Sequence, residues 1–224
     1  MKRPAQAQLS GEVVRAVPAQ NAGHGITVTG SATSRVAATS ARITLELSSA
    51  DRSLSLDAQT MQPIVAALVK AGADPSSVHL PLNFAAPGSS NVASITATVD
   101  HPTVGMMQNG IVTVGAAIAG MKNVILNGAM VFATVAHCQD QLDAIRGQAI
   151  ERARAKADSV AKDLDVHVGT VVNVVVSEPN NPDGTCATQY AINGSMNGPG
   201  GPQSPQDYVS VPVFTSVTIT YAIK

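Results

Sequence analysis

The stretch AIERARAKADSVAKDLDVHVG, from Ala149 to Gly169, constrains the fold more than any other part of the chain. Alanine recurs every four residues up to Ala161, with charged residues in the gaps. This spacing predicts a helix with small side chains along one side, which lets its axis approach a neighbour closely. The expected apolar stripe is Leu142, Ile145, Ala149, Ala153, Ala157, Val160, Ala161 and Leu164. We expect this stripe to pack on a sheet rich in Val and Ile, and the charged side to face water. A basic binding face is the alternative.

The remaining periodicity predicts further helices and strands around this one. Helical spacing covers residues 57–71, where Pro63 either bends the helix or marks the start of its regular part. It also covers 103–119, which Thr103 can cap. Asp140 is the expected cap of the helix that ends near 165. Strand-like alternation covers 26–30, 35–47, 78–82, 91–99, 122–136, 168–176 and 209–223. The segment from Gly30 to Ser34 is expected to turn the first two strands into a hairpin. The sequence therefore predicts an α+β fold with antiparallel sheets.

Two local features allow more than one interpretation. The Asn127-Gly128 pair marks either a hairpin turn or a bulge within one strand. Residues 177–207 are rich in Asn, Gly, Pro, Ser and Gln, and are too long for a simple connection. We expect this segment to be a mobile loop, a lid or an interaction arm.

Composition restricts the class of protein. Apolar residues make up 45% of the 224, so a sizeable core can form, but only 3% are aromatic and none is Trp. The formal net charge is −1, which excludes a strong electrostatic attraction to nucleic acid. No apolar run reaches the length of a membrane-spanning helix, which is about 18 residues.

The N-terminus and the cysteines bear on localisation. MKR followed by Ala5-Gln6-Ala7 looks like the two ends of a signal peptide without its apolar middle. Residues 1–25 are thus either the remains of an export signal or a flexible polar leader. An exported protein could pair Cys138 with Cys186, closing a loop of about 50 residues worth on the order of 4 kcal/mol. Two unrelated thiols are an equal alternative.

We predict no catalytic, cofactor-binding or metal-binding residues. The five histidines have no i, i+3 or i, i+4 spacing, and no Cys-x-x-Cys pattern exists. His137 and Cys138 are neighbours, and neighbours on a strand point to opposite faces, so a Cys–His dyad is not expected. The seven methionines either fill gaps in the core or take up oxidants reversibly, and gap-filling is the preferred interpretation.

The run AIERARAKADSVAKDLDVHVGTVVNVVVSE resembles the signature of the SIMPL domain family. ITVTGSATSRVAATSARITLEL resembles the opening of that family, and VPVFTSVTITYAI resembles its last strand. The resemblance implies a two-lobed α+β domain over residues 26–223, with lobes at about 26–100 and 101–223. It also implies export to the bacterial periplasm or cell surface, ring-like or channel-like homo-oligomers, and a link to oxidative stress. Pro63, the glycine-rich second helix and Asp165 depart from the family's pattern.

These observations support three hypotheses about function. The first is a non-enzymatic, exported envelope protein that acts through homo-oligomeric assembly. The second is a module that binds a protein or a small ligand of unknown identity and is gated by residues 177–207. The third is a redox protein that uses Cys138 or the methionines.

Overall fold

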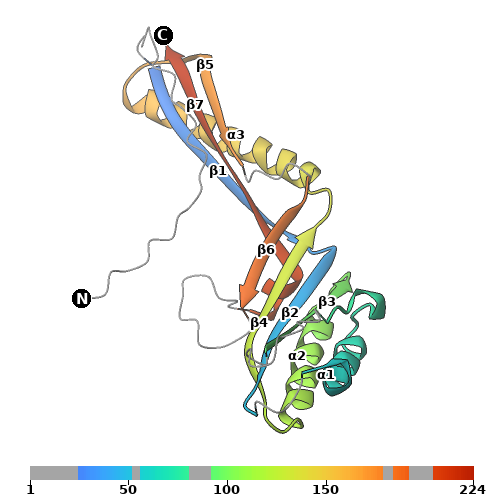
Figure 1. The fold of residues 1–224 in the computed structure, drawn as a ribbon. Helices are drawn as coiled ribbons and strands as arrows, with labels where there is room; N and C mark the ends of the chain where they lie inside the picture. The colour runs from blue at the N-terminus through green and yellow to red at the C-terminus, as the bar shows by residue number, and fades with distance from the viewer. Residues whose placement is uncertain (1–24, 52–55, 81–91, 179–183, 192–203) are drawn as a thin grey trace, which may run out of the picture.

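The computed structural model describes residues 25–51, 56–80, 92–178, 184–191 and 204–224. In these residues it contains two antiparallel sheets and three α-helices, so the α+β class is confirmed. The three-stranded sheet has the order β1 (Gly25–Ala37), β7 (Ser210–Ile223), β5 (Val168–Ser177). The four-stranded sheet has the order β3 (Val92–Asp100), β2 (Ser40–Ser49), β4 (Val124–Val135), β6 (Cys186–Ala191). Figure 1 shows the two sheets at opposite ends of an elongated molecule.

The helices are divided between the two sheets. The helix α3 (Gln139–Asp163) lies along β1 and β7, whereas α1 (Ala58–Lys70) and α2 (Val104–Ala119) lie beside the four-stranded sheet (Figure 1). Two short 3₁₀ helices, η1 (Pro75–Ser77) and η2 (Pro205–Val209), complete the described elements. Each sheet therefore has one face covered by helix, and each lobe has its own cluster of buried apolar side chains.

The expected hairpin between the first two strands is wrong. The strand β1 continues through Gly30, which pairs with Val217 of β7, and β2 belongs to the other sheet. Gly30 lies within a strand because a helix backbone passes over it. A Cβ at this position would overlap the carbonyl oxygen of Ala149 and lie 2.5 Å from the nitrogen of Ala153. A glycine inside a strand can mark such an approach as well as a turn.

The two lobes were expected to be consecutive parts of the chain that meet near residue 100. The two sheets do not follow this division. The strands β1 and β2 follow each other in sequence but lie in different sheets, and β7 returns from the end of the chain to pair with β1. Strand partners are set by the path of the whole chain, which local periodicity does not contain.

The alanine stripe of α3 is buried as expected. Ala149, Ala153 and Ala157 are fully buried against the three-stranded sheet, together with Leu142 and Ile145. Val160 and Leu164 were expected on the same stripe but are 38% and 61% exposed. Val160 lies off the four-residue alanine spacing, since Ala157 and Ala161 on either side of it are buried, and Leu164 is the C-cap residue after the last helical residue. The four-residue alanine spacing thus marks the packed face, and the charged side of α3 is exposed.

The helix ends differ from expectation in one case. Thr103 caps α2 by accepting a hydrogen bond from the Met106 nitrogen, as predicted. The helix α3 begins at Gln139 with Cys138 as its N-cap, so Asp140 is not the cap but lies in the first turn. There its carboxylate still suits the positive end of the helix dipole.

The helix α1 contains Pro63 and starts five residues before it. Asp57 accepts a hydrogen bond from the Thr60 nitrogen and caps this first turn. The regular part of the helix therefore begins ahead of the proline, and a start near Pro63, one of the two alternatives from the sequence, is wrong.

Three further segments complete the comparison. At Asn127 the structure has a bulge and not a hairpin turn, because the register of β4 against β2 shifts between Gly128 and Leu126.

The expected strand 78–82 amounts to one isolated bridge between His79 and Thr96, while residues 81 and 82 lie outside the described part. The segment 177–207 is not wholly a loop, since it contains β6 and most of η2. Its residues 179–183 and 192–203 lie outside the described part.

Candidate interaction surface

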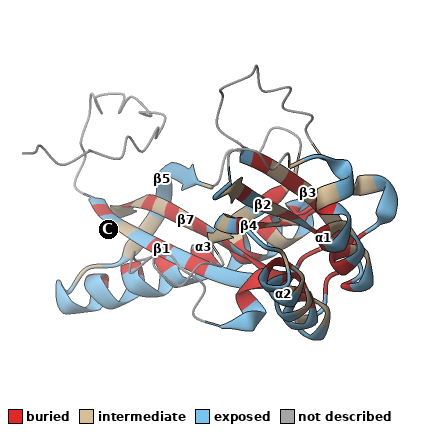
Figure 2. Ribbon diagram, turned by 60° about the horizontal axis from the view of Figure 1, so that its bottom comes forward, coloured by how far each residue is buried: buried red, intermediate tan, exposed pale blue. Residues whose placement is uncertain are grey.

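The strand β5 forms one edge of the three-stranded sheet and is exposed along its length. Among the described residues it pairs only with β7. Its large apolar side chains are 40–64% exposed, and these are Val171, Val172, Val174, Val175 and Val176. Figure 2 shows β5 as a largely exposed strand beside the buried stripe of β7. An edge strand with apolar side chains offers both unpaired backbone groups and apolar surface to a partner.

Only part of β5 is regular. The register against β7 shifts between Val168 and Val171 and again before Asn173, whereas Asn173 to Ser177 pair in unbroken register. Bulges at an edge disturb the row of hydrogen-bonding groups that a further strand would need. The segment 173–177 is therefore the part of this edge best suited to receive a strand.

The opposite edge of the same sheet is β1, and cations from α3 occupy its backbone acceptors. The guanidinium of Arg152 donates to the carbonyl oxygen of Ser31, and the ammonium of Lys156 donates to that of Thr29, each at 2.7 Å. Charged side chains over an edge hinder the addition of another strand. The two edges thus differ: β1 is blocked by charge, and β5 presents valines.

An ion pair fixes the end of β5 to α3. The guanidinium of Arg146 donates to both carboxylate oxygens of Glu178 at 2.7 Å, and the buried Thr215 hydroxyl donates to the same carboxylate. The hydrogen bonds from Arg146 lower the pKa of Glu178 below its ordinary value, against an opposing effect of burial. A two-point Arg–carboxylate contact is strong and directional, so it holds the exposed strand in place.

The face of this sheet opposite α3 is polar. Hydroxyls pair across β1 and β7, with Thr27 to Thr220 at 3.0 Å and Thr29 to Thr218 at 2.9 Å. Phe214, 52% exposed, is a large apolar side chain on the same side of β7. This face therefore contrasts with the valine-rich edge beside it.

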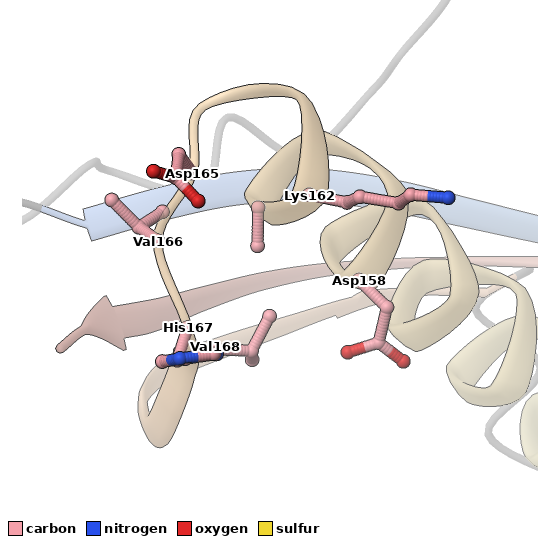
Figure 3. Close-up of a pocket in the computed structure, with 7 residues that line it drawn as sticks. Asp158, Lys162, Asp165, Val166, His167 and Val168 are labelled. Carbon is pink, nitrogen blue, oxygen red and sulfur yellow. The ribbon is translucent and has the colours of Figure 1, made fainter.

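A polar pocket of about 300 Å³ lies where α3 turns into β5, lined in part by Asp158, Lys162, Asp165 and His167. Figure 3 shows the two carboxylates on different sides of this pocket and the ammonium of Lys162 directed away from them. The backbone of His167 exchanges two hydrogen bonds with Lys224, which holds the C-terminus at this turn. The titratable groups do not converge on one point, so the pocket offers no acid–base pair.

The two cysteines form a disulfide bond, with Cα atoms 5.8 Å apart. Cys138 is fully buried and Cys186 is 3% exposed, so no free thiol remains for chemistry. His137 lies in a turn with a φ of 56°, a left-handed conformation, and not on a strand as assumed from the sequence. The sulfur of its neighbour Cys138 is bonded to that of Cys186, so Cys138 has no thiol that could form a Cys–His dyad.

Two searches of the described residues were negative. No group of three or more His, Cys, Asp or Glu side chains within them is arranged to hold a metal ion. None of the helices in the same part of the chain combines the length and hydropathy needed to cross a membrane.

Sequence reasoning identified β5 as a strand but not as an exposed edge. The usable signal was the run VVNVVVS, which has valine at both odd and even positions. Such a run is typical of a strand buried on both faces, yet this strand is exposed. Monomeric proteins rarely expose contiguous apolar surface, so an exposed edge strand with valines on both faces is unusual.

The fold and the surface define a two-lobed α+β protein with an open, apolar sheet edge. The pattern of the SIMPL family, described as a protein of unknown function (DUF541), matches residues 26–223, and the chain belongs to this family. No curated protein matches the chain.

The chain is also similar to solved structures of low identity. One is the regulatory subunit of aspartate kinase from Thermus flavus, 13% identical over 87% of this chain and 89% of that one, with a TM-score of 0.26. The corresponding subunit from Thermus thermophilus is 12% identical over 87% and 88%, also with a TM-score of 0.26. Aspartokinase alpha and beta subunits are 10% identical over 87% and 88%, with a TM-score of 0.24.

Proposed function

We propose that this protein is a non-enzymatic, exported SIMPL-domain protein that acts by assembling with copies of itself through β5. The observation that carries the proposal is the difference between the two edges of the three-stranded sheet. Arg152 and Lys156 occupy acceptors on β1, whereas β5 leaves its valines exposed. A two-fold symmetric interface requires a self-complementary patch, and an antiparallel β5–β5 pair meets that requirement.

Export is the second part of the proposal, and the disulfide supports it. Disulfides persist in oxidising compartments and are rare where glutathione keeps thiols reduced. The bond between Cys138 and Cys186 is buried and joins two distant parts of the fold. Trapping free thiols with a mass-tagged maleimide in fractionated cells tests this: an exported protein stays unlabelled, and a doubly labelled protein contradicts export.

Sedimentation equilibrium at micromolar concentration tests the assembly. The monomer mass is 22.8 kDa, so we expect a multiple of it for the unchanged protein. The double variant Val174→Lys/Val176→Lys places like charges at the edge, and we expect its dissociation constant to rise at least tenfold, about 1.4 kcal/mol. Val112→Lys is the matched control, because Val112 is 71% exposed on α2, away from this edge.

Two outcomes would contradict the proposal. A strict monomer for the unchanged protein removes the assembly itself. Equal weakening by the β5 variant and the Val112→Lys control would mean that assembly does not depend on β5.

A further inference from the structure

The other lobe contains an apolar cavity that takes no part in the surface described above. It has a volume of about 160 Å³ and lies between α2 and the four-stranded sheet. Ile43, Leu45 and Ala129 line it from the sheet, and Met107 lines it from the helix. Ile111, half-buried, and Gly115, exposed, lie at its opening on the helix side. In Figure 1 this region is the lower lobe, where α2 lies beside β2 and β4.

The glycines of α2 explain how the cavity arises. Each glycine in a helix interior costs about 1 kcal/mol relative to alanine. At Gly110 packing favours the small residue, because a Cβ there would lie 3.1 Å from the Cβ of Ala71, which is tighter than most such contacts. At Gly115 no atom lies within 4 Å of such a Cβ. A side chain at Gly115 would therefore meet open space, and the glycine leaves this side of the cavity clear.

The bulge in β4 contributes from the other side. The extra residue, Asn127, lies between Leu126 and Ala129, which both line the cavity. A bulge bends its strand and interrupts regular packing. The helix and the strand thus each carry a local irregularity at the same place.

The lining determines what the cavity can hold. All ten residues are apolar side chains or glycine, and none offers a side-chain donor, acceptor or charge. Water needs two to four polar partners, whereas an apolar cavity of about 150 Å³ stays dry and binds benzene. We propose that this cavity binds the uncharged hydrocarbon part of a small ligand, about the size of a benzene ring. The flexible thioether of Met107 allows the lining to adapt to its occupant.

Benzene itself is the probe for the first experiment, followed by ¹³C-methyl methionine spectra of the full chain. Met107 lines the cavity and is 2% exposed, whereas Met61 is fully buried in the same core but does not line the cavity. We expect a saturable shift of the Met107 methyl signal and at most a small shift of Met61. The absence of a saturable shift, or equal shifts of both signals, would overturn the proposal.

A pair of variants locates the site. Gly115→Leu places a side chain at the opening, and we expect the affinity for benzene to fall at least tenfold. Gly105→Leu is the matched control, since its Cβ also meets nothing within 4 Å and Gly105 does not line the cavity. Unchanged affinity in Gly115→Leu would place the ligand elsewhere and overturn the proposal. The experiment is independent of assembly, because the cavity and β5 belong to different sheets.

Discussion

Gly30 is the residue at which β1 and α3 come together with no space for a side chain. The backbone of α3 at Ala149 and Ala153 occupies the position that a Cβ on Gly30 would need. Alanine on the helix and glycine on the strand are therefore complementary. The contact is between backbones, so neither side can relax by a change of rotamer.

The variant Gly30→Ala is expected to lose about 3 kcal/mol of unfolding free energy, at the upper end for overpacking in a core. Denaturation in urea measures the loss. Gly147→Ala is the control, because nothing lies within 4 Å of its Cβ on the exposed side of α3. There we expect a gain of up to about 1 kcal/mol from helix propensity. Equal effects of the two variants would contradict the close approach.

Glu178 makes the stability of the fold depend on pH in the acidic range. Its pKa is lower in the folded protein than the ordinary 4.5, chiefly through the hydrogen bonds from Arg146. The contribution is therefore complete above the unfolded-state pKa and is lost as pH falls through the folded-state pKa. Glu178→Gln should be less stable than the unchanged protein at pH 7, and the difference should shrink below about pH 4. Glu151→Gln, on the exposed side of α3, is the control, and a pH-independent difference for Glu178→Gln would contradict this account.

At the scale of elements, the end of α3 shows why one departure from the family pattern is tolerated. Asp165 has a φ of 53°, the left-handed conformation that glycine adopts most readily. The nitrogen of Val166 donates to the Ala161 oxygen at 2.9 Å, which closes the helix end. Aspartate is among the residues that adopt this conformation at a moderate cost.

The variant Asp165→Gly is expected to raise the unfolding free energy by about 0.5–1 kcal/mol, because it removes backbone strain and a carboxylate at the negative end of the helix dipole. Thermal denaturation measures the change. Asp165→Asn separates the two causes, since it keeps a side chain that tolerates the left-handed conformation and removes the charge. A glycine variant less stable than the unchanged protein would contradict the role of strain.

At the scale of the whole molecule, the disulfide joins the two sheets. Cys138 precedes α3, which packs on the three-stranded sheet, and Cys186 begins β6 of the four-stranded sheet. The covalent loop between the two cysteines contains α3 and β5, so the proposed assembly strand lies within it. Near the same junction, Arg35 of β1 pairs with the buried carboxylate of Asp207 in η2.

Removing the bond by Cys138→Ala/Cys186→Ala is expected to cost about 4 kcal/mol for a loop with a sequence separation of 48. The melting temperature should fall in the variant and become insensitive to reductant, whereas reductant should lower it in the unchanged protein. Two titratable thiols in unreduced, denatured protein would contradict the bond.

Local periodicity was enough to predict most helices and strands. The buried face of α3 and the alternating side chains of β7 could be predicted from residue spacing alone. Apolar residues repeat with the period of a helix or a strand on the side of the element that is buried. The strand β6 was missed for a physical reason. It has six residues, CATQYA, and gains its stability from pairing with β4 and from the disulfide. Both are long-range contacts.

The sequence by itself determined the type of the three α-helices and of most strands, the small-residue face of α3 and the family. Only the tertiary structure decided which strands share a sheet, that the cysteines pair, and that β5 is an exposed edge while Arg152 and Lys156 block β1. The reason is that the spacing of apolar residues indicates only which side of a single helix or strand is buried. An edge, a disulfide or a cavity depends on segments far apart in the sequence, 48 residues apart for the two cysteines, or on their precise separation in space.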